Sequence, residues 1–158
     1  MNQRVMNQRG SRRLVRLGWL SLCVLLLASL LVGCSGKPPM PSIKVGKTTV
    51  HVERSTYSWR AFTSSVVADY PGPVHQIDLD TEATLIPNPA PDAKVLIVFT
   101  QKPKRILLTR WVNGTAEPEV EINGASFPLP TASGAHLFSI RAEWRQGGGS
   151  YAFAVKIP

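Results

Sequence analysis

HLFSIRAEW (residues 136–144) and YAFAVKI (residues 151–157) are the two clearest strands in this sequence. In each, one residue in two belongs to an apolar or aromatic face, which is the period of a strand with one buried side. The members of that face are His136, Phe138, Ile140, Ala142 and Trp144, then Tyr151, Phe153, Val155 and Ile157. The connection Gln146–Ser150 is rich in glycine, so the sequence predicts a C-terminal β-hairpin with an aromatic inner face.

Further short strands precede this hairpin, each bounded by turn signals. We expect them in the ranges 48–52, 66–68, 94–100, 105–112 and 120–122, whereas 74–79 fits either a brief strand or one helical turn. Asn113-Gly114 and Asn123-Gly124 indicate tight turns with positive φ. From Ile43 onward, no segment has a convincing helical period. The pattern predicts an all-β domain, a single antiparallel β-sandwich of immunoglobulin-like architecture that lacks the Cys…Trp…Cys signature of true immunoglobulin domains.

The N-terminal residues have the pattern of an export signal. Five arginines and no acidic residue precede the apolar run Leu17–Val32, and Gly33 and Cys34 follow it. A basic segment, an apolar segment and a small-residue exit together indicate a secretory signal helix that is removed. The apolar run is shorter than the ~20 residues of a membrane-spanning helix. This disfavours a transmembrane anchor and leaves a soluble secreted product as the other alternative.

Leu31-Val32-Gly33-Cys34 resembles the bacterial lipobox. The resemblance implies transfer of a diacylglyceryl group to the Cys34 thiol and cleavage between Gly33 and Cys34. The residue types fit, because a cysteine sulfur is the strong nucleophile among side chains and Gly33 leaves the backbone open to a peptidase. Arg12-Arg13 is compatible with twin-arginine export, although ordinary Sec export is favoured. We therefore expect a protein anchored by lipid to the extracytoplasmic face of the cell membrane.

Removal of the signal changes the charge and the domain count. The whole chain has a net charge of +8, but five of its 18 Lys and Arg lie in 1–33, so thirteen remain against ten Asp and Glu. A net charge of +3 gives little support to nucleic-acid binding. We expect three parts: a signal over 1–33, lipidated Cys34 with a Pro-rich polyproline II tether over 34–42, and one sandwich over 43–158. The mature domain then contains no disulfide, because Cys23 leaves with the signal.

No standard catalytic string occurs, and we expect neither an enzyme nor a cofactor. His51, His75 and His136 lie far apart in the sequence, so structural histidines are favoured over a metal or catalytic site. The carboxylates of Asp78, Asp80 and Glu82 fit a solvated edge better than a calcium site, because the loop lacks the glycine and oxygen ligands of a calcium motif. A second alternating group, Glu117, Glu119 and Glu121, marks the water-facing side of a strand.

The densest basic cluster comprises Lys102, Lys104, Arg105 and Arg110. Such a cluster contacts anionic wall polymer or lipid headgroups in some proteins. Charged residues beside a sheet edge also suppress aggregation, and this second interpretation is favoured.

Two strands are apolar on both faces. In the strand 94–100, one face carries Val95, Ile97 and Phe99, and the other carries Leu96 and Val98. In the strand 105–112, one face carries Ile106 and Leu108, and the other carries Leu107 and Trp111. A sandwich buries one face of each strand, so the second needs a cover. The segment 70–92 is the favoured cover. The alternative is a surface for a partner or ligand, with Tyr70 and Trp111 as aromatic anchors.

The chain also resembles a group of small Gram-positive lipoproteins. The shared elements span most of 47–157: Thr56-Tyr57-Ser58-Trp59, Asp69 with Pro71-Gly72-Pro73, Lys102-Pro103, Gly134, Phe138, Ala142-Glu143-Trp144, Gly148 and Tyr151-Ala152-Phe153. The resemblance implies a single β-sandwich on a lipid anchor and carries over no activity. In the family's pattern, cysteines occupy the positions of Ser58 and Val67, which implies a disulfide there. This chain has neither cysteine, so we expect a looser loop.

These observations together predict a monomeric binding or accessory module of the cell envelope that does no chemistry. Its expected partners are the membrane, through the lipid on Cys34, and a protein or wall component. The first alternative is an accessory subunit of a transporter, sensor or protease system. A hydrolase with a convergent site is the less favoured alternative from another class.

Overall fold

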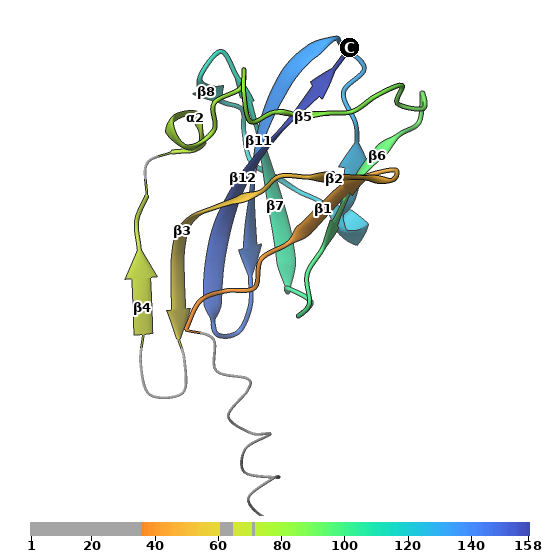
Figure 1. Ribbon diagram of the computed structural model, residues 1–158. Coiled ribbons are helices and arrows are strands. Elements are labelled where there is room, and N and C mark those ends of the chain that lie inside the picture. Colours follow the sequence, from red (N-terminus) through yellow and green to blue (C-terminus); the bar gives the residue numbers. More distant parts are fainter. Residues whose placement is uncertain (1–35, 61–64, 71) are drawn as a thin grey trace, which may run out of the picture. The chain divides into compact units, whose positions relative to one another are not determined.

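Two sheets face each other across an aromatic core (Figure 1). The structure is a computed structural model that describes residues 36–60, 65–70 and 72–158, and residues 36–158 form one compact unit. Gly33, Cys34 and the predicted signal lie outside the described residues. The all-β sandwich predicted from the hydrophobic alternation is confirmed.

The smaller sheet has the strand order β10-β6-β1-β2 and is antiparallel throughout. Its strands are β1 (Ser42–Val45), β2 (Thr48–Val50), β6 (Lys94–Val98) and β10 (Ser126–Pro128). Ile43 is paired with Val50 on one side and Ile97 on the other. Because side chains alternate along a strand, Ile43, Val95 and Ile97 all point into the core, where they are at most 2% exposed.

The larger sheet has the order β4-β3-β12-β11-β7-β8. Its strands are β3 (Glu53–Arg60), β4 (Ser65–Ala68), β7 (Arg105–Val112), β8 (Thr115–Ala116), β11 (Gly134–Glu143) and β12 (Gly147–Ile157). Two short strands join it, β9 (Val120–Glu121) beside β7 and β5 (Thr84–Leu85) beside the end of β12. The β5–β12 pair is parallel, whereas every other described pair in the sheet is antiparallel.

Two short helical turns complete the described residues. The ambiguous segment 74–79 overlaps the single-turn helix α2 (Pro73–Gln76), so its helical alternative is the correct one. The 3-10 turn η1 (Asn123–Ala125) contains the predicted positive φ at Gly124. Asn113 and Gly114 both have positive φ, 50° and 77°, and connect β7 to β8. This is the two-residue hairpin turn that the Asn-Gly pair predicted.

The aromatic inner face of the C-terminal hairpin is confirmed. Phe138 stacks on Phe153 with 5.5 Å between ring centroids, and Trp59 meets Trp144 edge to face at the same distance. Tyr151 and Phe153 are fully buried. The Trp144 indole N–H donates to the carbonyl of Gln101 at 2.8 Å, so this side chain is both packed and satisfied.

The glycine-rich run is strand rather than connection, which corrects the predicted hairpin. The turn consists of Arg145 and Gln146, and Trp144 N–H donates to the Gly147 carbonyl at 2.7 Å. β12 therefore starts at Gly147, directly against β3. A Cβ on Gly147 would lie 2.1 Å from the Ser58 carbonyl oxygen. The glycine is there because the neighbouring strand leaves no room for a side chain.

The Pro-rich segment packs on the sandwich, which corrects the predicted free tether. Pro38 is fully buried, its carbonyl accepts a 2.9 Å hydrogen bond from Arg54 Nη2, and the Pro39 carbonyl accepts one from the Tyr151 hydroxyl at 2.5 Å. A polyproline segment makes no internal hydrogen bonds, so its carbonyls are free to accept from side chains. Burial raises the pKa of Tyr151 to about 12, although Arg54 opposes the shift. The spacer ahead of the domain therefore ends before Pro38 rather than at residue 42.

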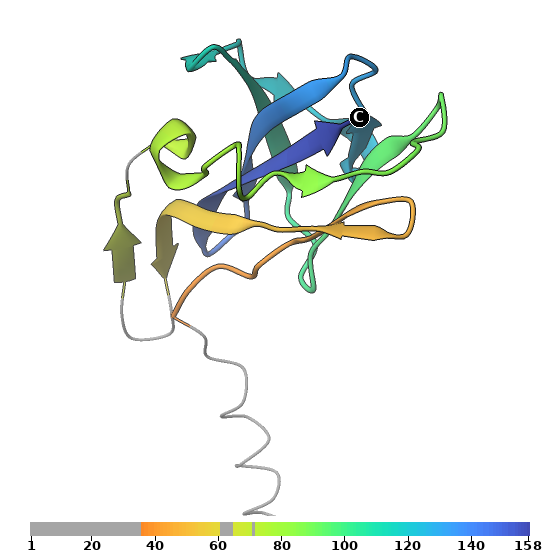
Figure 2. The ribbon, with the colours of Figure 1, turned by 45° about the horizontal axis from the view of Figure 1, so that its top comes forward.

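Figure 2 shows the course of this segment from another side. The chain from Gly36 runs along the sandwich into β1 and turns back as β2, so the Pro-rich residues and the smaller sheet are continuous. The C-terminus lies at the opposite end of β12 from the β11–β12 turn (Figure 1).

Candidate functional site

The outward face of the smaller sheet carries an exposed apolar pair. Leu96 is 44% exposed and Val98 is 48% exposed, because β6 directs the neighbouring residues Val95 and Ile97 into the core. The residues opposite Leu96 in register are Ser126 and Lys44, and the residue opposite Val98 is Ser42. Among the described residues, the segment 70–92 does not bury either side chain. We call Leu96 and Val98 the β6 apolar pair.

A cleft of about 430 Å³ adjoins the β6 apolar pair. Val98 lines it together with Phe99 and Ile106, and Lys102 and Lys104 lie on its wall. Apolar walls with a few charged groups are typical of binding sites of this volume. A second cleft, of about 560 Å³, opens between β7 and β10 and is lined by Phe127 and Phe138.

The outward face of the larger sheet is covered at Trp111. This side chain is partly buried and packs with Leu137, Ala152 and Ala154 under three residues of the favoured covering segment, Ile77, Leu79 and Ala83. Its indole N–H donates to Ser139 Oγ at 2.9 Å. The predicted cover by 70–92 is therefore confirmed for Trp111, and this residue does not contribute an open anchor.

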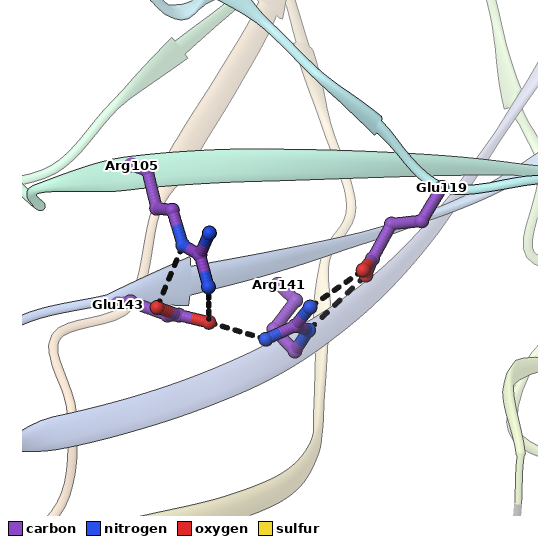
Figure 3. A network of polar contacts seen from close by, with 4 residues as sticks. All are labelled: Arg105, Glu119, Arg141 and Glu143. Carbon is purple, nitrogen blue, oxygen red and sulfur yellow. Dashed lines mark hydrogen bonds and ion pairs between the residues drawn. The ribbon is translucent and has the colours of Figure 1, made fainter.

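Leu107 is also removed from the predicted binding surface. It is 9% exposed and lies opposite Arg141 in the β7–β11 register. Arg141 belongs to a row of four charged side chains along this face, shown in Figure 3. The guanidinium of Arg141 is bidentate to Glu119, at 3.1 and 2.5 Å, and that of Arg105 is bidentate to Glu143, at 2.8 and 3.1 Å.

A short contact between Arg141 and Glu143 joins the two pairs into one network (Figure 3). The hydrogen bond from Arg105 is the largest cause that lowers the pKa of Glu143, although partial burial opposes it. The hydrogen bonds that Arg141 donates to Glu119 are likewise the largest cause that raises the pKa of Arg141. Each charge is thus matched by its neighbour, and the row forms a structural staple across β7, β11 and the segment before β9.

Tyr70 is the fifth residue of the predicted surface, and it lies on the other sheet from the β6 apolar pair. It follows β4, is 50% exposed, and its backbone N–H donates to Thr56 Oγ1 at 3.3 Å. The five predicted surface residues therefore do not form one surface. Leu96 and Val98 lie together on the smaller sheet. Leu107 is buried and Trp111 is partly buried under the covering segment, and Tyr70 is exposed on the larger sheet.

The three histidines do not converge. His51 Nε2 lies 2.8 Å from Glu53 Oε1, but the two side chains are 55% and 46% exposed and line none of the clefts described above. His136 Nε2 is 2.7 Å from the Ala132 carbonyl, and His75 is exposed in α2. Within the described ranges, no group of three histidine, cysteine or acidic side chains has the placement of a metal site.

The acidic run after α2 holds its own turn together. Asp78 accepts hydrogen bonds from Thr81 Oγ1 at 2.9 Å and from the backbone N–H of Asp80 at 3.0 Å. These bonds, with the one from Thr81 as the largest cause, lower the pKa of Asp78. Glu82 in turn accepts from the N–H of Asp78. The carboxylates serve as local turn acceptors, in agreement with the favoured expectation of a solvated edge.

The basic residues are grouped differently from the sequence cluster. Arg105 is held in the network, and Arg110 lies beside the 560 Å³ cleft, away from Lys102 and Lys104. Arg60 and Arg145 come to the same end as those lysines, because Arg60 N–H donates to the Gln146 carbonyl at 2.9 Å. Sequence reasoning missed both arginines. Both could have been recognised by position, because Arg60 is the last residue of β3 and Arg145 lies in the turn between β11 and β12.

Ser58 and Val67 are direct partners in the β3–β4 register. These are the two positions at which the resembled family has cysteines, and partners in an antiparallel pair lie within the Cα separation that a disulfide spans. Among the described residues, no helix has the length and apolar character of a membrane span.

No known family matches the chain, and neither a characterised protein nor a solved structure is significantly similar to it. The similarity to Gram-positive lipoproteins stays a prediction from sequence motifs.

Proposed function

We propose that the mature chain is a lipid-anchored binding or accessory module on the extracytoplasmic face of the cell membrane. In this proposal the β6 apolar pair contacts a protein partner of the envelope, and the domain does no chemistry. One observation carries the binding role: the smaller sheet leaves Leu96 and Val98 about half exposed in its middle, on a strand with neighbours on both sides.

The position of the pair strengthens this argument. A single exposed leucine or valine is ordinary on a protein surface, whereas apolar side chains grouped beside a cleft favour an interaction site. β6 is paired with β10 over residues 94–96 and with β1 over residues 95–98, so Leu96 is presented through its side chain and the β1 side of the backbone is already paired at Val98. A partner would therefore bind through side-chain packing rather than by adding a strand to an edge.

The lipid anchor is tested by exchanging the two cysteines separately. In growing cells supplied with labelled fatty acid, Cys34→Ser should abolish labelling and move the protein out of the membrane fraction. The matched control is Cys23→Ser, which makes the same substitution at the other cysteine, within the predicted signal, and should leave labelling intact. Retention of the label in Cys34→Ser would contradict the anchor.

The binding role is tested by photocrosslinking in intact cells. A photoreactive residue at Leu96 should give a discrete adduct, and one at Val67 should not. Val67 is the matched control because it is also an exposed apolar strand residue, at 70%, but on the other sheet. The mass of the adduct distinguishes a transporter, sensor or protease partner. Equal patterns at both positions, or none at Leu96, would contradict the assignment of this face.

A further inference from the structure

One end of the sandwich is basic, and it is the end at which the described chain begins. Arg60, Lys102, Lys104 and Arg145 are all exposed there. None of the four forms an ion pair with a residue that the structure describes. We call these four residues the basic end.

Backbone and side-chain hydrogen bonds around one turn hold the basic end together. The turn containing Arg145 binds the end of β3, where Arg60 N–H donates to the Gln146 carbonyl. The loop after β6 is held on the other side, because Trp144 donates to Gln101 and Lys104 N–H donates to the Glu143 carbonyl at 2.7 Å. The four cations thus come from three separate loops or strand ends that the fold brings together.

The start of the described chain lies at this same end. A Cβ on Gly36 would be 4.0 Å from Val66, which is paired with Trp59, and Trp59 is in turn paired with Gly147 beside the turn. Figure 1 shows the segment from Gly36 starting near the β11–β12 turn. Pro38 is held on the domain by Arg54, and only three residues separate it from Cys34 in the sequence. The linker between the lipid site and the domain is therefore short.

Charge on the rest of the domain is distributed differently. Asp78, Asp80 and Glu82 precede β5, which pairs with Val155 and Lys156 at the far end of β12. At about 3.3 Å per residue, the 11 residues of β12 separate the two ends by roughly 35 Å. Glu143, the acid next to the basic-end turn, is already paired with Arg105 and Arg141.

We propose that the basic end contacts anionic lipid headgroups and orients the domain on the membrane. This inference rests on the proposed lipid anchor at Cys34. Two residue steps of at most ~3.6 Å each place Gly36 within about 7 Å of Cys34, which is inside the Debye length of about 8 Å at physiological ionic strength. A lysine or arginine within a Debye length of an anionic surface strengthens the attraction by roughly fivefold. The acidic residues before β5 then point away from the membrane, and the β6 apolar pair lies on the side of the domain.

The experiment uses the processed, lipidated protein in vesicles of phosphatidylcholine, with or without phosphatidylglycerol. A fluorophore on Gln146→Cys reports the basic end, and one on Thr131→Cys, before β11, reports the other end. A quencher on the lipid headgroup should quench the label at 146 several-fold more than the label at 131, in vesicles with phosphatidylglycerol only, and added salt should reduce the difference.

Charge-neutralised variants separate the basic end from the short linker. Replacing Arg60, Lys102, Lys104 and Arg145 by Gln should remove the difference between the two labels. The matched control replaces four exposed lysines elsewhere by Gln and should retain it: Lys44, Lys47, Lys94 and Lys156. The proposal would be overturned if the quenching difference between labels 146 and 131 persisted in the variant of the basic end. It would also be overturned if that difference were just as large in vesicles without phosphatidylglycerol.

Two further outcomes also count against the proposal. Shielding of the label at 146 by a soluble glycerol-phosphate polymer, but not by anionic vesicles, would assign the basic end to wall polymer instead. Flotation with the vesicles is measured in the same samples. A wild-type chain that does not float contradicts the anchor and this inference together, whereas a floating chain without the difference contradicts the orientation alone.

Discussion

The outward faces of the two sheets differ in how they are covered. On the larger sheet, the segment around Ile77 packs over Trp111, and the ion-pair network crosses Leu107. On the smaller sheet, Leu96 and Val98 stay about half exposed. The chain therefore covers the outward apolar residues of β7, in the interior of the larger sheet, and leaves those of β6 open, whereas Val67 is exposed on the edge strand β4. This contrast is the reason to assign the open face to a partner rather than to incomplete packing.

The largest loss of stability is expected for substitutions in the core, which lies between the two sheets. We expect Trp144→Ala to lower the free energy of unfolding by about 3–5 kcal/mol. Its ring contacts Trp59 and Phe99, and its N–H is bonded to Gln101, so truncation leaves a cavity and an unpaired carbonyl. Denaturant unfolding followed by circular dichroism measures the loss. A change below about 1 kcal/mol would show that the hairpin's inner face is not the core.

The edge of the larger sheet is where its stability is most easily raised. Ser58 and Val67 are register partners, so the double variant Ser58→Cys/Val67→Cys should form a disulfide. A loop of this length gives about 2–3 kcal/mol in the chain-entropy account. The melting temperature should rise under oxidising conditions and return to the wild-type value on reduction. The matched control is Ser58→Cys alone, which lacks a partner, and equal melting of oxidised and reduced double variant would contradict the register.

Trp111→Ala tests the covered face directly. The loss of its packing against Ile77 and Leu137, and of its bond to Ser139, should lower the free energy of unfolding by about 2 kcal/mol. Hydrogen exchange should also quicken in the segment 77–83, because its packing partner is removed. If exchange in that segment were unchanged, the segment would not be a cover, and the contrast between the two faces would disappear.

Glu143→Gln weakens the ion-pair network that crosses Leu107. We expect a loss of roughly 0.5–1 kcal/mol at neutral pH, since the pairs are partly exposed. The bond from Arg105 lowers the pKa of Glu143, so its contribution is present above the ordinary carboxyl pKa and is lost as pH falls through the lowered value. The variant and the wild type should therefore converge in acid. The control Glu117→Gln changes a carboxylate that has no ion pair with a described residue, and it should show no such convergence.

The sequence predicted the fold class because strand periodicity is local. β11 and the aromatic half of β12 alternate without interruption, and both are correct. β3 was missed, because the polar Ser55 occupies one of its inward positions and obscures the alternation in the sequence. Long-range contacts account for the other errors: Gly147 reads as a turn residue until the adjacent carbonyl of Ser58 is known.

The candidate site was harder to predict than the fold. Apolar faces on 94–100 and 105–112 were recognised, but periodicity does not tell which face a distant segment covers. The packing of Ile77 on Trp111, and not on Leu96, depends on the path of the chain after β4. The basic end had the same difficulty, since Arg60 and Arg145 lie 85 positions apart and meet only through the β3–β12 pairing.

A small effect on stability is expected for the β6 apolar pair itself. Leu96→Ser with Val98→Ser should change the free energy of unfolding by no more than about 1 kcal/mol per site, because both side chains keep about half of their surface in water when the domain folds. The adjacent inward residue provides the control: Ile97→Ala should cost about 2–4 kcal/mol, since Ile97 is 2% exposed on the same strand. Denaturant unfolding of the three proteins measures both values. A loss per site in the double variant close to that of Ile97→Ala would mean that the outward face is packed within the chain, and the case for a partner on this face would then fail.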